Sequence, residues 1–120
     1  MRNNNDLPER FLKFSVRIIR LANKLPKTPA GFAVASQLIK SGTSIGANYY
    51  EAQDASSRND FLNKISISLR EARETHYWLM VIKLSQLLPG DLVDPEIVEC
   101  NEIISILVKS VKTTKKNGLK

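Results

Sequence analysis

The sequence predicts an all-α protein, an antiparallel up-down-up-down bundle of four helices. Apolar residues recur at helical spacing, capping residues and prolines divide the chain into four long stretches, and no stretch alternates as a β-strand would. Short connections between long helices favour antiparallel neighbours. The expected helices cover residues of about 8–25, 29–55, 58–88 and 95–113.

Length and composition are those of a single domain. The chain has 120 residues, of which 42% are hydrophobic and 25% charged, so we expect one core within residues 1–113 and a basic, flexible tail at 114–120. No apolar run approaches the roughly 18–20 residues that would cross a bilayer, so we expect no contact with a membrane. The start, MRNNNDLPER, lacks the apolar region of a signal peptide, and Cys100 has no second cysteine to pair with. We therefore expect a cytoplasmic protein.

The helix expected at 8–25 has the clearest periodicity. Its apolar residues follow steps of three and four, at Phe11, Phe14, Ile18, Leu21 and Leu25. Further apolar residues widen this arc to more than half of the circumference, at Leu12, Val16 and Ile19. Such a helix must be covered on more than one side, which predicts that a second copy of the chain covers what the bundle itself leaves exposed.

The helix expected at 29–55 begins with a capping threonine followed by proline, Thr28-Pro29. Between two apolar flanks runs a polar row that consists of Gln37, Ser41, Ser44, Asn48 and Glu51. Gly42 and Gly46 lie one turn apart on the same side. Because a glycine inside a helix costs about 1 kcal/mol relative to alanine, this pair predicts a place where another backbone comes close.

Capping residues, prolines and a glycine also mark the expected ends of the last two helices. Ser57 and Asp60 have the spacing of a capping box, Pro89-Gly90 is expected to end the third helix, and Asp94-Pro95 is expected to start the fourth. The third helix should supply the core with Phe61, Ile65, Leu69, Ala72, Leu79 and Met80. The fourth should supply Ile97, Ile104, Leu107 and Val111.

Positive charge gathers at the two ends of the chain. The net charge is +6, and residues 1–27 and 109–120 each carry +5, so residues 28–108 carry −4. On the first helix the cations form a stripe that contains no acid, at Arg10, Lys13, Arg17, Arg20 and Lys24. This basic stripe spans about 20 Å, enough to neutralise several phosphates. Further cations assist it, at Lys112, Lys115 and Lys116. A solvated outer face is an equally simple interpretation, and the sequence leaves both open.

Two motifs resemble those of a known bacterial family. The first is SGTSIGAN at residues 41–48, followed by Glu51-Ala52. The second is Asp60-Phe61 leading to Lys64, and then REARETHYWL at residues 70–79. Over residues 10 to about 110, the chain resembles the proteins encoded in intervening sequences of 23S ribosomal RNA genes. The resemblance implies a four-helix bundle that assembles as a ring-like homopentamer, in a family without an established enzymatic activity.

The fold is more distantly similar to the accessory variability determinant of diversity-generating retroelements. That similarity implies a basic pentamer that partners a reverse transcriptase and binds nucleic acid. The SGTSIGAN motif is typical of the intervening-sequence proteins, so a role with a reverse transcriptase is the more remote inference.

The polar residues of these motifs are expected to hold an assembly in register. We expect four residues of the polar row, all except Gln37, to meet Arg70, Glu71 and Thr75 across a helix or subunit boundary. Buried polar groups without partners cost about 1–3 kcal/mol each, so such a network would fix one arrangement. The residues assigned to assembly and the polar network are Ser41, Gly42, Ser44, Gly46, Asn48, Glu51, Arg70, Glu71, Glu74, Thr75 and Trp78.

No group of residues predicts catalysis, a metal ion or a cofactor. His76 and Cys100 are interpreted as packing residues, since a nucleophilic pair would need their helices to bring them together. Glu71 and Glu74 are three residues apart, but the Glu-x-x-His pairs of di-iron bundles are absent from the sequence. The segment around Gly42 lacks the lysine and the preceding strand of a phosphate-binding loop.

Three functions follow from these observations. The leading hypothesis is a non-enzymatic homo-oligomeric scaffold that binds nucleic acid, RNA before DNA, through phosphate contacts from the basic stripe. The alternative is a protein-interaction module, such as an accessory subunit that docks a reverse transcriptase. A third, a hydrolase that uses His76, would require a nucleophile within hydrogen-bonding reach.

Overall fold

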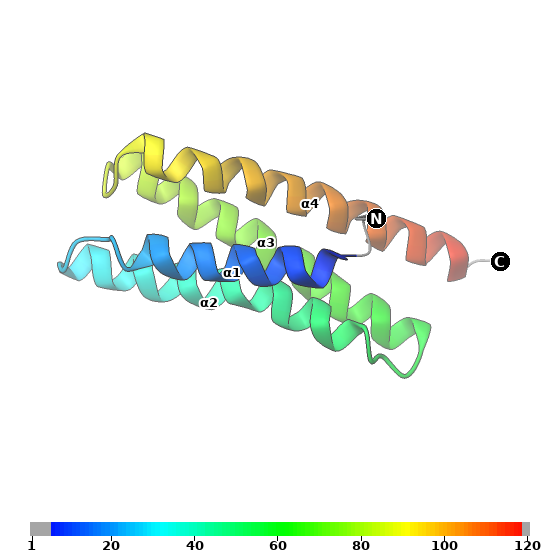
Figure 1. The fold of residues 1–120 in the computed structure, drawn as a ribbon. Helices are drawn as coiled ribbons and strands as arrows, with labels where there is room; N and C mark the ends of the chain where they lie inside the picture. The colour runs from blue at the N-terminus through cyan, green and yellow to red at the C-terminus, as the bar shows by residue number, and fades with distance from the viewer. Residues whose placement is uncertain (1–5, 119–120) are drawn as a thin grey trace.

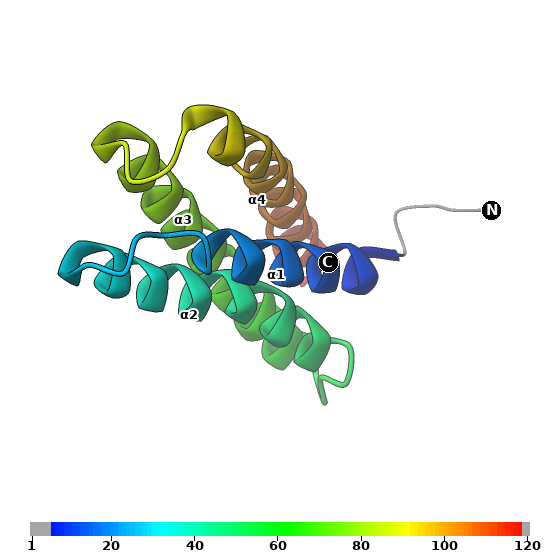
Figure 2. The same cartoon turned by 60° about the vertical axis from the view of Figure 1, so that its left-hand side comes forward.

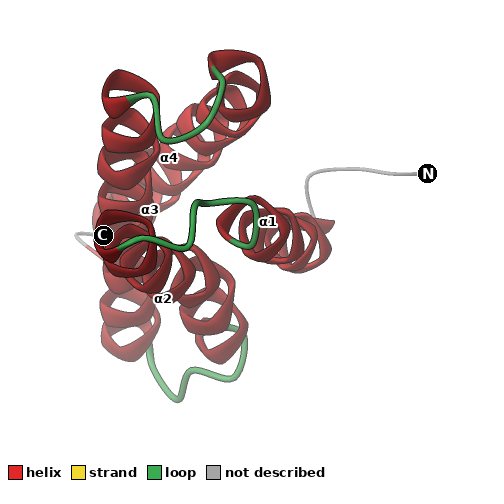
Figure 3. Ribbon diagram, turned by 90° about the vertical axis from the view of Figure 1, so that its left-hand side faces the viewer, coloured by secondary structure: helices red, strands yellow, loops and turns green. Residues whose placement is uncertain are grey.

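A computed structural model describes residues 6–118 as four helices joined by loops (Figure 1). They are α1 (Leu7–Ala22), α2 (Pro29–Ala52), α3 (Arg58–Ser85) and α4 (Gly90–Gly118). Figure 3 shows helices and loops and no strand over this part of the chain. The prediction of an all-α, four-helix fold is therefore confirmed for the described residues.

The four helices do not pack equally closely. Figure 1 shows consecutive helices joined by short loops at alternate ends of the molecule. α2 packs against α1 on one side and α3 on the other, and α3 packs against α4. The fourth neighbouring pair, α1 and α4, is in the least contact of all. Figure 2 shows why, since α3 and α4 slope across the direction of α1 and α2. The seam between α1 and α4 is thus the least closely packed side of the bundle.

The predicted caps form at the starts of α2 and α3. The Thr28 hydroxyl accepts a hydrogen bond from the Gly31 amide at 3.1 Å. The Ser57 hydroxyl accepts one from the Asp60 amide, also at 3.1 Å, while the Asp60 carboxylate accepts from the amide of Ser56 at 3.2 Å. These bonds satisfy amides that the first turn of a helix leaves without partners.

Three helices end three residues earlier than predicted, at Ala22, Ala52 and Ser85. The apolar pattern extends past two of these ends because loop residues Leu25 and Leu88 are also buried. An apolar pattern includes buried side chains from helices and loops alike, so it does not mark where the helical backbone ends.

The predicted bounds of α4 are wrong at both ends. The helix starts at Gly90 instead of Asp94-Pro95, and Pro95 lies inside it. Val93, in the first turn, is fully buried, so packing holds this turn in the helix although Pro95 has no amide hydrogen to donate. Residues 114–118, expected as a flexible tail, continue the helix to Gly118. The end of that expected tail, residues 119–120, lies outside the described residues.

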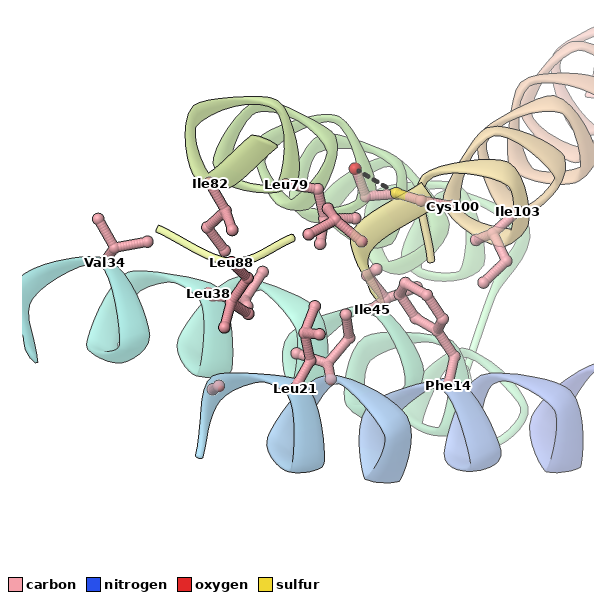
Figure 4. Close-up of a cluster of buried hydrophobic side chains, with 14 of the residues drawn as sticks. Phe14, Leu21, Val34, Leu38, Ile45, Leu79, Ile82, Leu88, Cys100 and Ile103 are labelled. Carbon is pink, nitrogen blue, oxygen red and sulfur yellow. Dashed lines mark hydrogen bonds between the residues drawn. The ribbon is translucent and has the colours of Figure 1, made fainter. Parts of the chain in front are cut away.

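One continuous core joins all four helices. Figure 4 shows Phe14 and Leu21 of α1 converging with side chains from α2, α3 and α4. The apolar row predicted for α1 is buried in full. Among the side chains predicted for the last two helices, Ile65, Ala72, Leu79 and Leu107 are buried, and the others are half-buried. No helix within residues 6–118 combines the length and apolar character that a membrane span requires.

The glycines of α2 lie where α1 comes closest. A Cβ atom on Gly42 would lie 2.6 Å from Cγ2 of Ile18, and one on Gly46 would lie 3.3 Å from Cβ of Phe11. Ile18 is fully buried and branched at Cβ, so it has little freedom to move aside. The absence of a side chain at Gly42 therefore sets how closely α1 can pack.

We expect Gly42→Ala to lower the free energy of unfolding by up to about 2 kcal/mol. Overpacking costs about 1–3 kcal/mol, which exceeds the roughly 1 kcal/mol that alanine gains over glycine in a helix. Gly90→Ala is the matched control, because a Cβ atom there has only an Asp94 oxygen at 4.0 Å beside it. Urea denaturation of both variants tests the prediction, which is wrong if Gly42→Ala is as stable as the control.

Candidate functional site

The structure divides the basic stripe of α1 into paired and unpaired cations. Arg10 holds two carboxylates of α4: its Nε atom donates to Glu99 Oε2 at 2.7 Å, and its Nη2 atom donates to Glu99 Oε1 at 2.8 Å and to Glu102 Oε1 at 2.7 Å. The hydrogen bond to Glu99, followed by that to Glu102, raises the pKa of Arg10 above its ordinary value. Arg10 is thus held by three charge-assisted hydrogen bonds to two carboxylates.

Arg17 makes a similar contact one turn nearer the start of α4. Its Nε donates to Glu96 Oε2 at 3.1 Å, and its Nη2 lies 3.0 Å from Glu96 Oε1. Lys13 pairs within α1, with Glu9 at 2.9 Å. By contrast, Arg20 and Lys24 are exposed and form no ion pair within residues 6–118.

The sequence shows that no position of the stripe on α1 is acidic. It does not show that glutamates of α4 pair with the arginines of the stripe. These lie 79 to 92 positions away from their arginine partners. Only the packing of α4 beside α1 brings the charges together.

A second basic surface lies on the last turns of α4. We define the α4 lysine patch as Lys109, Lys112, Lys115 and Lys116, which are all exposed. Lys109, Lys112 and Lys116 follow steps of three and four and so share one face of the helix. None of the four forms an ion pair within residues 6–118. A Cβ atom on Gly118 would lie 3.4 Å from the Arg58 side chain, so another cation borders the end of α4.

The other flank of α1 carries an apolar groove. This α1–α2 groove has a volume of about 520 Å³ and is lined by Pro8, Leu12, Ser15, Thr43, Gly46, Ala47, Tyr50 and Glu51. Leu12 is 63% exposed and Tyr50 is 70% exposed, and Val16 and Ile19 extend the exposed apolar surface along α1. The bundle therefore leaves uncovered the part of α1 for which the sequence predicted a second cover.

The motifs of α2 and α3 meet at one buried pair of hydroxyls. The side-chain oxygens of Ser41 and Thr75 lie 3.0 Å apart, and both residues are fully buried. The Thr75 hydroxyl also lies 2.8 Å from the carbonyl oxygen of Glu71. Close by, the Ser68 hydroxyl donates to the carbonyl of Ile45 at 2.7 Å. Two buried polar contacts thus join α2 to α3.

The structure does not bring the rest of the predicted polar network together. Ser44 donates to the carbonyl of Lys40 at 2.6 Å, and the Asn48 amide donates to the carbonyl of Ser44 at 2.8 Å, so both bond within α2. Glu51 pairs with Lys64 of α3 at 2.8 Å instead of with Arg70.

Of the remaining network residues on α3, Arg70 and Glu74 are exposed, and Glu71 and Trp78 are half-buried. The Trp78 indole donates to Glu74 at 3.4 Å. Burial, with the nearby charge of Glu74, raises the pKa of Glu71. The network is therefore local to each helix, apart from the Ser41–Thr75 and Glu51–Lys64 contacts.

Cys100 bonds to the backbone of α3, and no hydrogen bond joins it to His76 within residues 6–118. The Cys100 thiol is fully buried and donates to the carbonyl of Ala72 at 3.3 Å. Burial raises the pKa of this thiol to about 12, so the nucleophilic thiolate is not populated at neutral pH. His76 is half-buried on α3. Within residues 6–118, histidine, cysteine and acidic side chains nowhere gather in the group of three that would hold a metal ion.

The sequence matches a protein family described as 23S rRNA-intervening sequence protein, over residues 3–109. The fold is similar to a crystal structure from Bacteroides thetaiotaomicron VPI-5482, described as a protein of unknown function from the S23 ribosomal protein family. The two share 37% sequence identity with a TM-score of 0.82, and the similarity covers 88% of this chain and 97% of that chain. None of the curated proteins matches the sequence.

The Ser41–Thr75 contact predicts a coupled effect on stability. We expect Thr75→Val to cost about 1–2 kcal/mol, because it leaves the Ser41 hydroxyl facing an apolar side chain. The double variant Ser41→Ala/Thr75→Val should cost less than the sum of its single substitutions. Thr114→Val is the control, since Thr114 bonds only within α4, at 2.8 Å from the Ser110 carbonyl. Urea denaturation that gives additive costs would show that the two hydroxyls do not interact.

Proposed function

The chain belongs to the 23S rRNA-intervening sequence protein family, and from this premise we propose that it is a non-enzymatic homo-oligomeric scaffold that binds nucleic acid, RNA before DNA, through phosphate contacts. The observation that carries the proposal is the α4 lysine patch, whose four exposed cations form no ion pair within residues 6–118. Cations without carboxylate partners are free to bind phosphates and release counterions.

The position of the patch supports this function better than a purely structural role. Lysines in the last turn of a helix offset the partial negative charge of its end, which accounts for Lys115 and Lys116. Lys109 and Lys112 lie more than one turn before Gly118, where that effect has faded. The face from Lys109 to Lys116 is about 10 Å long, so it offers phosphates a row of contacts and not a single one.

The proposed site is therefore centred on α4 instead of on the α1 stripe. Arg20 and Lys24 form no ion pair within residues 6–118, but they lie near the start of α4, at the opposite end of this helix from the patch. Arg10 and Arg17 are engaged by glutamates. The patch contains no aromatic side chain on which a base could stack. We expect binding to be led by phosphates and only weakly dependent on base sequence.

The α1–α2 groove supports the self-association in this proposal. Exposed apolar side chains along one helix are the ordinary mark of an interface. A ring-like homopentamer of antiparallel four-helix bundles, as the family resemblance implies, would present the lysine patch five times. Weak phosphate contacts would then add through multivalency. The same groove supports the second candidate, a module that docks another protein such as a reverse transcriptase.

Removing three cations from one face of the patch should weaken RNA binding at low salt. For Lys109→Gln/Lys112→Gln/Lys116→Gln, we expect the slope of log affinity for oligouridine against log salt to flatten by about 2, since each phosphate contact contributes about 0.7. The matched control removes three exposed cations elsewhere, with Lys27→Gln/Lys40→Gln/Arg73→Gln. The proposal fails if wild-type affinity is independent of salt, or if the control loses as much.

Self-association should depend on the α1–α2 groove. We expect Leu12→Asp to reduce the assembly towards the monomer mass of 13.5 kDa, because burying a carboxylate in an apolar interface is unfavourable. Leu84→Asp on α3 is the control, since Leu84 is 75% exposed and lies outside the groove. Light scattering measures the masses, and a wild-type protein of 13.5 kDa would refute the oligomer.

A further inference from the structure

We propose that Arg10 and Arg17 form a second phosphate-binding site, which α4 keeps closed with carboxylates that stand in for phosphates. This inference rests on the proposed function, because its ligand is the backbone of the same nucleic acid. It explains why a row of cations on α1 is matched by three glutamates on the facing helix, Glu96, Glu99 and Glu102.

The contacts have the geometry with which a guanidinium binds a phosphate. Arg10 donates from Nε and Nη2 to the two oxygens of Glu99, at 2.7 and 2.8 Å. Arg17 donates one hydrogen bond, from Nε to Glu96 Oε2 at 3.1 Å, and its Nη2 lies 3.0 Å from Glu96 Oε1, which accepts no hydrogen bond within residues 6–118. Such paired contacts suit carboxylates and phosphates alike, so an incoming phosphate can take the place of either glutamate.

The spacing of the two arginines also fits a polyanion. They lie seven residues apart on α1, which is about 10 Å of helix. One strand of a duplex carries a phosphate about every 3.4 Å along its axis, so a segment of about three nucleotides spans both arginines.

The seam that holds these contacts is open to exchange. α1 and α4 pack least closely of the neighbouring helices, and a cleft of about 280 Å³ opens between them. Arg17 and Glu96 line this cleft together with the unpaired cations Arg20 and Lys24. Glu102, the second partner of Arg10, has a side chain that is 58% exposed. Exposed ion pairs are weak, so a polyanion displaces Glu102 first and at small cost. Glu99 and Glu96, whose side chains are 16% and 12% exposed, are displaced after it.

The closed site lies along the same helix as the α4 lysine patch. Glu102 precedes Lys109 by seven residues, or about 10 Å. A strand bound to the patch therefore brings its next phosphates close to Arg10 at a high effective concentration. Binding begins on the lysines and extends to the arginines as phosphates displace the glutamates.

Neutralising the glutamates should open the site. For Glu96→Gln/Glu99→Gln/Glu102→Gln, we expect oligouridine to bind about tenfold more tightly at low salt, with a log–log salt slope steeper by about 1.4, which corresponds to two added phosphate contacts. Adding Arg10→Gln/Arg17→Gln should abolish this gain. The matched control, Asp54→Asn/Glu74→Gln/Asp94→Asn, removes the same charge from exposed acids and frees Lys83 instead. It should show a much smaller gain.

Each outcome separates this inference from the proposed function. An unchanged affinity, a gain that survives the arginine substitutions, or an equal gain in the control overturns the closed site. The proposed function then stands if neutralising the lysine patch still weakens binding, and both are wrong if no variant binds. If circular dichroism shows the triple variant unfolded, Glu102→Gln replaces it, and a gain of about two- to threefold that requires Arg10 is the supporting result.

Discussion

Ile18 of α1 lies so close to Gly42 that a methyl group at this position of α2 would meet it at 2.6 Å. Next to Gly42, the buried hydroxyl of Ser41 reaches Thr75 of α3 on the other side of the helix. α2 is therefore held on both flanks by contacts that allow little change of distance. Close packing on one flank and a polar contact on the other give this helix a single position between its neighbours.

The position of α1 decides what each of its flanks can do. With its apolar row in the core, the helix turns Leu12 outwards beside α2 and turns Arg10 and Arg17 towards α4. The apolar flank is left without a cover, and the charged flank is neutralised within the chain. Of the two basic surfaces, the lysines on the last turns of α4 form no ion pair within residues 6–118, and neither do Arg20, near the end of α1, and Lys24, just after it. Packing thus pairs some cations of this basic chain with carboxylates and leaves others unpaired.

Local patterns in the sequence predicted the number of helices, the caps at Thr28 and Ser57, and the buried row of α1. Each of these depends on residues a few positions apart. The ion pairs of Arg10 and Arg17 depend on glutamates in another helix, and no local pattern reveals them. The polar row of α2 was predicted to form hydrogen bonds across a helix or subunit boundary. Ser44 and Asn48 donate instead to backbone carbonyl oxygens in the preceding turn of their own helix.

The end of α4 differs from the rest of the bundle in how it is held. Beyond Leu107 the helix contains no buried residue, although it continues to Gly118. Its last turns depend on their own backbone hydrogen bonds, and segments with so little buried surface open with free energies close to zero. The amides of these turns should exchange with solvent far faster than those beside Cys100. A nucleic acid held by the lysines would slow that exchange, so order in this segment reports on the ligand while the core of the bundle stays unchanged.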